Sequence, residues 1–301
     1  MPRHKSLQIP SEPWRPYGTC TAVSRGTGWV AVAALAVAQF GCATPVEGID
    51  AFAVRQGWGR ELREGTEFRH VVFVNTAHDA SDRLHVYLEG DGSPYLDRWT
   101  VAPDPTPRRP LMLHLMALDS APSVYVGRPC YLGLARDPPC VPADWTVDRY
   151  SERVVASLAS IIDELRRRSG CSAVELYGHS GGGTLAVLIA PRLPGVTRVV
   201  TLAANLDIEA WTSYRSYTPL LGSLNPVGLG PLPTGIAQLH LAGAEDDVVP
   251  AWIVERAAPQ IGNGTVEVLP GVTHATGWER HWREVLDESS KGSIPQIRAV
   301  P

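Results

Sequence analysis

The sequence of 301 residues has few cysteines, little charge and no long apolar run. Its five cysteines form no C-x-x-C pair and are not spaced with histidines as metal ligands are, which argues against a zinc site. Charged residues make up 19% of the chain, the formal net charge is −4, and no basic patch is interleaved with aromatics. Nucleic-acid binding is therefore not expected. The apolar run at residues 29–38 is too short to span a bilayer comfortably.

The N-terminal stretch has the layout of an export signal. Residues 1–28 are polar and basic, residues 29–38 are apolar, and Gln39-Phe40-Gly41-Cys42-Ala43 follows. We predict a signal peptide over residues 1–41. Its long basic lead suggests that translation starts nearer Val23. Without residues 1–41 the chain keeps 23 basic and 30 acidic residues, a formal charge of −7.

The Gly41-Cys42 pair resembles the cleavage site of bacterial lipoproteins, in which the cysteine is lipidated and becomes the new N-terminus. Gln39 replaces the usual leucine, so ordinary signal cleavage near the same point is the alternative. Lipidation of Cys42 would hold the protein at a membrane of the bacterial envelope. Ala43 offers no acidic retention signal, which by resemblance favours the outer membrane; otherwise the protein is periplasmic or secreted.

Two further cysteines bracket a loop rich in proline and glycine. Cys130 and Cys140 lie close enough in sequence to form a disulfide in an oxidising compartment. The alternative is two unrelated buried thiols, and the sequence assigns no partner to Cys171.

A change of hydrophobic period marks the central motif. Residues 174–177 have the pattern of a buried strand, residues 184–190 have that of a helix, and Gly178-His179-Ser180-Gly181-Gly182 joins them. Flanking glycines permit a tight turn that exposes the Ser180 hydroxyl, as a nucleophile requires. The Gly181 N–H, at the start of the helix, points to where an oxyanion would form. A purely structural glycine turn is the alternative.

The hydrophobic pattern predicts strands and helices in alternation along the chain. Strands are expected at 68–74, 84–88, 123–126, 196–202, 236–241 and 265–269, and helices at 144–168 and 278–286, with 111–118 either helix or strand. The expected fold is a mostly parallel central sheet flanked by helices. We predict a linker or extension at 42–66, one domain at 67–288 with a small aromatic cap insertion at about 203–235, and a flexible tail at 289–301.

The loop that follows residues 84–88 offers a second oxyanion donor. Glu89-Gly90-Asp91-Gly92 leaves a strand upstream of the nucleophile, and a glycine lets the backbone approach a substrate. We expect the Asp91 N–H to donate, with Gly92 as the alternative. A simple turn is the other interpretation, and Glu89 and Asp91 alone do not make a metal site.

A serine nucleophile needs a histidine to take its proton and a carboxylate to orient that histidine. Ser180, Asp246 and His274 each follow a predicted strand, in that order. Asp247, Glu245 and Asp207 remain alternatives to Asp246. The other histidines are not expected to act as the base. His179, within the turn, is expected to serve packing or substrate contact, and His281 belongs to the face of the final helix. His70, His85 and His114 lie in apolar runs and are expected to be core histidines.

Over about residues 67–288 the sequence resembles the α/β-hydrolase superfamily. The resemblance implies Ser180 as nucleophile, His274 as general base and then acid, Asp246 as the acid, and the N–H groups of Asp91 and Gly181 as the oxyanion hole. The loop has Glu89-Gly90 where the family has His-Gly.

The expected function is that of an exported, lipid-anchored serine hydrolase. It would cleave an ester or related acyl bond of a small molecule through an acyl-enzyme, without a cofactor. A carboxylesterase or lipase-like activity is the first expectation, and thioesterases and peptidases share the same residues. The alternatives are a catalytically silent binding module of the envelope and a redox role for Cys130 and Cys140. The sequence does not determine the oligomeric state.

Overall fold

The computed structural model describes residues 44–76, 78–79 and 81–291. The predicted signal peptide, the Cys42 lipidation site and most of the predicted tail lie outside these residues. Within them, eight strands form one sheet in the order β1-β2-β4-β3-β5-β6-β7-β8. In chain order the strands are β1 (Arg60–Glu64), β2 (Arg69–Asn75), β3 (Arg83–Leu88), β4 (Ser123–Val126), β5 (Ala173–His179), β6 (Val196–Leu202), β7 (Ala237–Gly243) and β8 (Thr265–Leu269).

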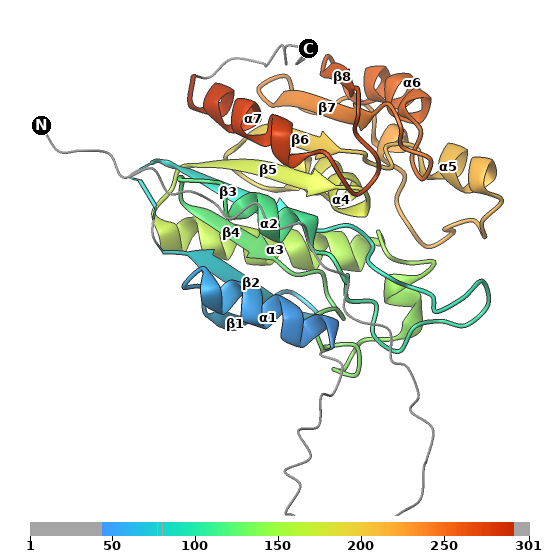
Figure 1. Ribbon diagram of the computed structural model, residues 1–301, viewed down its shortest axis with the longest axis horizontal. Helices are drawn as coiled ribbons and strands as arrows, with labels where there is room; N and C mark the ends of the chain where they lie inside the picture. Colours follow the sequence, from blue (N-terminus) through green and yellow to red (C-terminus); the bar gives the residue numbers. More distant parts are fainter. Residues whose placement is uncertain (1–43, 77, 80, 292–301) are drawn as a thin grey trace, which may run out of the picture. The chain divides into compact units, whose positions relative to one another are not determined.

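The sheet is parallel from β4 to β8, and β1 and β2 extend it with antiparallel pairs. β5 lies at its centre, and all of its residues except Ala173 are buried. Such burial is typical of a parallel strand that is covered on both faces. Because the parallel strands end at the same edge, the loops after β3, β5, β7 and β8 can meet there. This edge lies on the right in Figure 1.

Helices cover both faces of the sheet (Figure 1). α3 packs against α4 on one face, and α2 and α7 lie on the other, where Trp282 of α7 contacts the rings of Tyr87 and Tyr177. This arrangement confirms the predicted fold class. The α-helices are α1 (Pro45–Arg55), α2 (Leu111–Met116), α3 (Glu152–Ser169), α4 (Gly181–Ile189), α5 (Ile208–Arg215), α6 (Ala251–Ile261) and α7 (Glu279–Lys291), and the 3₁₀ helices are η1 (Pro142–Trp145), η2 (Ala190–Arg192) and η3 (Pro226–Leu229).

Residues 45–66, most of the segment expected to be a linker or extension, are instead part of the domain. Helix α1 begins at Pro45 and buries Ile49 and Ala53, and β1 pairs with β2 at the edge of the sheet. The sequence pattern hid β1 because four of its five residues are charged and none is fully buried. Charged side chains are common on edge strands, where they discourage pairing with other chains.

The helix predicted at residues 144–168 begins later, at Glu152 after the cap residue Ser151. Residues 142–145 form the separate 3₁₀ helix η1, because Pro142 can start a helix but the chain turns again at Thr146. The predicted end is correct: Gly170 follows Ser169 with a φ of 73°, which glycine adopts without strain. The ambiguous segment at 111–118 contains a short helix, α2.

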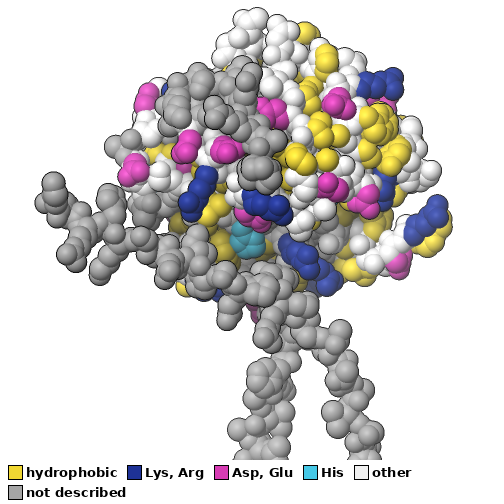
Figure 2. All heavy atoms as spheres, turned by 45° about the horizontal axis from the view of Figure 1, so that its top comes forward, with side chains coloured by type: hydrophobic (Ala, Val, Ile, Leu, Met, Phe, Trp, Pro, Cys, Tyr) yellow, Lys and Arg dark blue, Asp and Glu magenta, His cyan; other side chains and the backbone are white. Residues whose placement is uncertain are grey.

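One remaining boundary also differs from the structure: the segment expected to be a tail from 289 begins as the last turn of α7, which ends at Lys291. The expected cap insertion at 203–235 contains α5 and η3. None of the described helices is both long enough and apolar enough to cross a membrane. The face drawn in Figure 2 carries acidic and basic side chains side by side, in keeping with the small net charge of the chain.

Candidate active site

Ser180 lies on the tight turn between β5 and α4, as the motif predicts. Its φ of 51° and ψ of −123° are rare for a residue with a side chain. A Cβ at Gly178 would overlap the carbonyl of Gly182. Only glycine therefore fits at position 178, where the end of β5 lies against the start of α4. The strained turn is the geometry of a nucleophile elbow, which presents the serine hydroxyl at the end of the sheet.

The side chains of Ser180, His274 and Asp246 form one hydrogen-bonded chain. His274 Nε2 lies 3.1 Å from Ser180 Oγ, and His274 Nδ1 lies 2.8 Å from Asp246 Oδ2. The other carboxylate oxygen of Asp246 accepts the N–H groups of Val248 and Val249, both at 2.8 Å. These bonds fix the carboxylate in the turn after β7, and only 6% of Asp246 is exposed.

The three alternatives to Asp246 have other roles in the structure. Asp207 caps α5 by accepting the N–H of Ala210. Glu245 accepts the N–H of Gly271. Asp247 contributes its backbone carbonyl to Arg215, at 2.7 Å. None of them forms a hydrogen bond with His274 among the described residues, so the geometry selects Asp246.

The loop after β3 lies directly against the elbow. A Cβ at Gly90 would come within 3.3 Å of the Ser180 Cβ, and a Cβ at Gly182 would overlap the Leu88 carbonyl. The Gly181 N–H, in the first turn of α4, has no acceptor within its own helix. Neither it nor the Asp91 N–H is bonded to another described residue. The structure thus brings the two predicted oxyanion donors into neighbouring segments.

The Asp91 side chain is the centre of a buried ionic cluster that the sequence analysis missed. Its carboxylate is paired with Arg128 and with Arg149, the latter at 2.8 Å, and accepts the Tyr150 hydroxyl at 2.6 Å. Tyr131 donates its hydroxyl to the Asp91 carbonyl at 3.0 Å. Burial alone would raise the pKa of Asp91, but the two guanidinium groups hold it well below its usual range.

This cluster fixes both the side chain and the backbone of the residue that presents the second candidate donor. One carboxylate faces two guanidinium groups, so the cluster carries a net positive charge beside Ser180. A Cβ at Gly181 would overlap the Asp91 carboxylate, which shows how closely the cluster approaches the elbow. The arrangement therefore favours negative charge at the candidate oxyanion position.

Glu89 is buried beneath the same loop and binds backbone donors. Its two oxygens accept the N–H groups of Gly90 at 3.1 Å and Met112 at 3.0 Å. Burial raises the pKa of Glu89 to about 7, although these hydrogen bonds lower it. Glu89 thus anchors the loop to the start of α2.

The elbow residue His179 contacts the loop that carries His274. Its Nε2 lies 2.7 Å from the His274 carbonyl oxygen, and its Nδ1 lies 3.9 Å from Glu89. Burial, with the nearby His274 ring, lowers the pKa of His179 to about 3, so its ring is neutral at ordinary pH. His179 therefore holds the backbone of His274, a role beyond the packing or substrate contact predicted for it.

An open cavity of about 1150 Å³ contains Ser180 and His274 in its lining. One wall comes from α5 and residues 216–220, where the Trp211 and Tyr217 rings lie 5.3 Å apart. This wall agrees with the predicted aromatic cap. A second wall comes from residues 93–109, for which the sequence pattern predicted no helix or strand. The cavity is thus bordered by two segments, of which one was expected.

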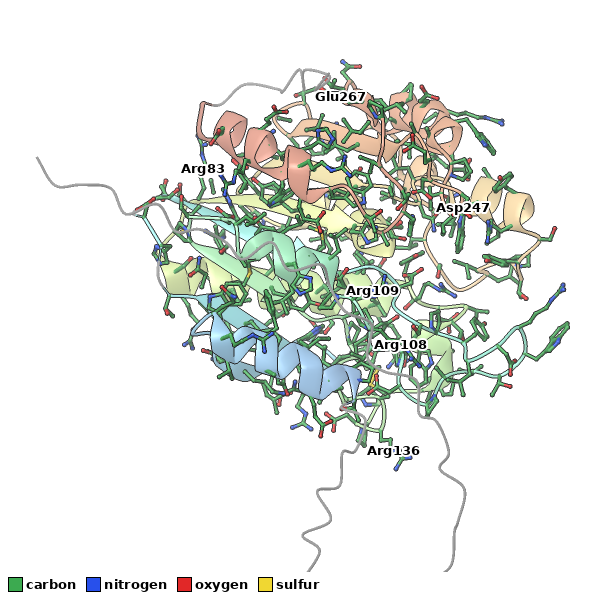
Figure 3. The ribbon with its side chains drawn as sticks, viewed as in Figure 1. Arg83, Arg108, Arg109, Arg136, Asp247 and Glu267 are labelled. Carbon is green, nitrogen blue, oxygen red and sulfur yellow. A yellow bond between two sulfur atoms is a disulfide. The ribbon has the colours of Figure 1, made fainter. Side chains whose placement is uncertain are left out.

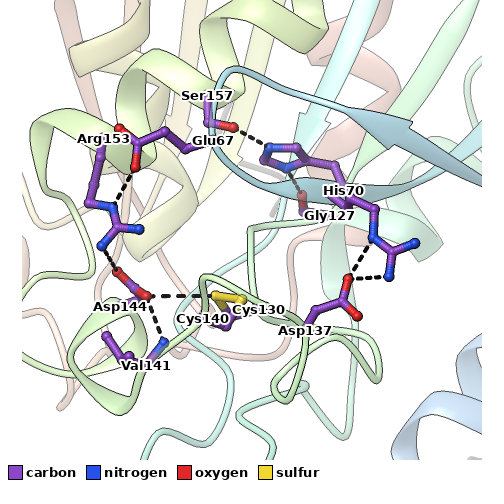
Figure 4. The surroundings of a disulfide bond; sticks show 11 residues. Glu67, His70, Gly127, Cys130, Asp137, Cys140, Val141, Asp144, Arg153 and Ser157 are labelled. Carbon is purple, nitrogen blue, oxygen red and sulfur yellow. Dashed lines mark hydrogen bonds and ion pairs between the residues drawn. A yellow bond between two sulfur atoms is a disulfide. The ribbon is translucent and has the colours of Figure 1, made fainter.

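A disulfide joins Cys130 and Cys140 in the structure (Figure 4). The loop that it closes starts two residues after Arg128, the partner of Asp91. Nearby, Asp144 accepts the Val141 N–H at 2.9 Å. Cys171 is buried as a free thiol. The oxidising compartment that this bond requires stays a prediction.

The histidines assigned to packing lie away from Ser180. Burial lowers the pKa of His70 to about 4, and its ring contacts the Gly127 carbonyl and the Ser157 hydroxyl. His85 lies 2.7 Å from Asp119, His114 packs against Phe52, and His281 is buried in α7. Within the described residues, no three His, Cys, Asp or Glu side chains are grouped so that they could hold a metal ion.

Comparison with known proteins identifies the fold. No family model matches the chain, and no curated protein matches its sequence. Among solved structures, a putative α/β hydrolase of unknown function from Agrobacterium tumefaciens has a TM-score of 0.51 at 14% identity, covering 81% of this chain and 100% of its own.

Two further solved structures are similar to this chain. Est1E from Butyrivibrio proteoclasticus, solved with ferulic acid bound, has a TM-score of 0.57 at 12% identity and covers 77% of this chain and 98% of its own. An esterase from Pyrococcus furiosus has a TM-score of 0.55 at 11% identity and covers 79% and 91%. At these identities the similarity establishes the fold, and the chain has the α/β-hydrolase fold.

Proposed function

We propose that the protein is a serine hydrolase that cleaves an ester or related acyl bond through a covalent acyl-enzyme. The observation that carries the proposal is the hydrogen-bonded chain Ser180–His274–Asp246 at the base of an open cavity. Three polar side chains from three separate loops meet in the order and geometry that activate a serine. The similar solved structure from Pyrococcus furiosus, which is named an esterase, supports the same chemistry.

In the proposed reaction, Ser180 Oγ attacks the substrate carbonyl carbon while His274 Nε2 takes the hydroxyl proton. Asp246 orients the ring and stabilises the imidazolium that forms. The Gly181 and Asp91 N–H groups would stabilise the carbonyl oxygen as it becomes negative. His274 then protonates the leaving group, and an acyl-enzyme remains on Ser180. Water, deprotonated by His274, releases the acid and restores Ser180.

Esters are the proposed substrates because the cavity is open and partly aromatic. Trp211 and Tyr217 offer an apolar wall beside Ser180, suitable for an acyl chain or an aromatic ring. Thioesters and amides would react by the same steps, so a screen of esters with matched thioesters and anilides would define the preferred bond.

We further propose that the protein is exported and anchored to a membrane of the bacterial envelope by a lipid on Cys42. The motif around Cys42 supports the anchor, and the Cys130–Cys140 pair suits an oxidising compartment. Mass spectrometry of the protein from its native membrane, beside a Cys42→Ala variant, tests the anchor. A diacylated N-terminal cysteine is expected, and an unmodified residue 42 in a soluble fraction would rule it out.

A fluorophosphonate probe tests the catalytic proposal, because it labels only an activated serine. Labelling mapped to Ser180 is expected in the native sequence, with loss in Ser180→Ala and a rate at least about 10³-fold lower in His274→Ala. Ser213→Ala, an exposed serine on α5, serves as the matched control and should label normally. A folded protein that takes up no probe and hydrolyses no ester would instead be a silent binding module.

A further inference from the structure

Arginine is in excess around the cavity that contains Ser180. Five lining residues are arginines and three are acidic, although acids outnumber bases in the whole chain. The arginines are Arg98, Arg108, Arg109, Arg149 and Arg215; the acids are Glu89, Asp91 and Asp97. The local charge thus has the opposite sign to that of the protein.

The three acids of the lining are already bound elsewhere. Asp91 is paired with the buried guanidinium groups of Arg128 and Arg149. Asp97 accepts the N–H groups of Trp99 and Thr100, each at 2.8 Å, and so closes its own turn. Glu89 lies beneath the loop, with its oxygens on backbone donors. None of these carboxylates is left to neutralise the arginines at the mouth.

Three of the arginines keep their charge without a carboxylate in ion-pair contact. Arg215 donates to the Asp247 carbonyl at 2.7 Å and to the Tyr217 hydroxyl at 3.2 Å, both neutral acceptors. Arg98 lies over the Trp99 ring at 5.0 Å. Arg108 is exposed and forms no ion pair with any described residue. Figure 3 shows Arg108 and Arg109 on the segment that leads into α2, at the same end of the sheet as Asp247.

Guanidinium groups that share one cavity without carboxylate partners repel one another. An anion that enters the cavity offsets this repulsion energy. Guanidinium is also the side chain that best matches the planar oxygens of a carboxylate or phosphate. We propose that the natural substrate carries an anionic oxyacid group, a carboxylate or a phosphate, at some distance from the bond that Ser180 attacks. The inference rests on the proposed hydrolase function and adds a substrate class to it.

An anionic lipid surface is the competing ligand for these charges. The tip of the 93–103 segment exposes 63% of Leu96 and 81% of Trp99, next to Arg98. Arg215, however, is only partly exposed and is held against the aromatic wall of the cavity, not at that tip. The arginines thus border the cavity from both sides, which favours a charged group inside it.

Two esters with the same leaving group test the inference. Mono-4-nitrophenyl glutarate and 4-nitrophenyl pentanoate differ only in a terminal carboxylate that replaces a methyl group. Hydrolysis by Ser180→Ala provides the background rate for each. We expect a higher kcat/KM for the glutarate, with a preference that falls as ionic strength rises, because salt screens exposed charges.

Arginine variants should remove the preference without removing the activity. Arg108→Gln and Arg215→Gln should each lower kcat/KM for the glutarate about two- to fivefold, and the double variant on the order of tenfold, as expected for exposed ion pairs. Arg108→Gln should leave the rate for the pentanoate unchanged. Arg136→Gln, an exposed arginine outside the cavity lining, is the matched control and should affect neither ester (Figure 3).

Each other outcome would overturn the inference. Equal kcat/KM values for the two esters, with Ser180 labelled by the fluorophosphonate, would support the hydrolase function but contradict the proposal of an anionic substrate. Stimulation of pentanoate hydrolysis by phosphatidylglycerol vesicles, lost in Arg98→Gln, together with no glutarate preference, would assign the arginines to a lipid surface. Hydrolysis of neither ester and no labelling of Ser180 would reject the hydrolase itself.

Discussion

The Nε2 atom of His179 lies 2.7 Å from the carbonyl oxygen of His274, so the residue beside the nucleophile holds the backbone of the proposed base. The Trp278 indole N–H donates to the same oxygen at 3.1 Å. His179 is neutral, because burial and the neighbouring His274 ring lower its pKa to about 3, and a neutral ring can donate through Nε2. The bond therefore links the turn after β5 to the loop after β8.

Replacement of His179 should lower turnover more than substrate binding. His179→Phe keeps a ring but loses the donor, and we expect kcat to fall about two- to tenfold with little change in KM, the effect of one lost hydrogen bond. His179→Gln retains an N–H donor and should recover part of that loss. Steady-state kinetics on a neutral ester, with melting temperatures for both variants, distinguish lost positioning from lost stability.

Asp91 should contribute strongly to stability because it neutralises two buried guanidinium groups. Asp91→Asn leaves Arg128 and Arg149 facing a neutral amide, and we expect a loss of about 3–5 kcal/mol in the free energy of unfolding. Asp163→Asn breaks a half-exposed pair with Arg166 and should cost less than about 1 kcal/mol. Urea unfolding at pH 7 compares them. Equal losses for the two variants would contradict the role of the cluster.

The contribution of Asp91 should also depend on pH. Its pKa in the folded protein lies well below the unfolded value of about 3.9, so its stabilisation is complete above that value and is lost as the pH falls toward the folded pKa. The difference in unfolding free energy between the native sequence and Asp91→Asn should therefore be about 1 kcal/mol smaller at pH 3 than at pH 7. A difference that grows on acidification would refute this.

Glu89 should have the opposite pH dependence. Its folded pKa of about 7 exceeds the unfolded value of about 4.3, so the folded state loses stability as the pH rises between these values. Relative to Glu89→Gln, the native sequence should lose on the order of 3 kcal/mol between pH 4 and pH 8, since one pKa unit corresponds to about 1.4 kcal/mol. Denaturant titrations at the two pH values measure this change. Glu255→Gln, an exposed residue of α6, should show no such change.

Removal of the disulfide should weaken the Asp91 cluster as well as the fold. The Cys130→Ser, Cys140→Ser double variant frees a ten-residue loop, which should lower the unfolding free energy by about 3 kcal/mol. Because Arg128 lies two residues before Cys130, kcat should fall too, at temperatures where the variant is still folded. Cys171→Ser, which removes only a free thiol, is the control. An unchanged kcat in the folded double variant would show that the disulfide does not influence the Asp91 cluster.

Short-range patterns explain most of what the sequence could predict. Ser180, Asp246 and His274 each follow a strand within a few residues, so strand ends and glycine spacing were enough to locate them. The preference for Asp246 over Asp247 depends on the turn in which Val248 and Val249 donate to one carboxylate oxygen. The hydrophobic period identified the buried strands but not β1, whose charged residues give no apolar pattern.

Long-range contacts account for what the sequence did not reveal. Arg128 and Arg149 reach Asp91 across 37 and 58 residues from segments without regular structure, and nothing in their local sequence marks them as buried. The linked roles of Glu89 and His179 likewise depend on how the loops after β3, β5 and β8 meet. The excess of arginines around the cavity has the same origin, since they come from three separate segments.

The hairpin at one wall of the cavity closes on itself. Tyr95 bridges to Val101, Leu96 donates to the Thr100 carbonyl at 2.9 Å, and Asp97 completes the tip. The Asp91 cluster, by contrast, is held by Arg128, Arg149 and Tyr150, none of which belongs to the hairpin. This part of the cavity wall is thus physically separate from the cluster beside Ser180. Residues 95–101 form a self-contained unit, and their exchange should reshape one wall of the cavity while the Asp91 cluster stays in place.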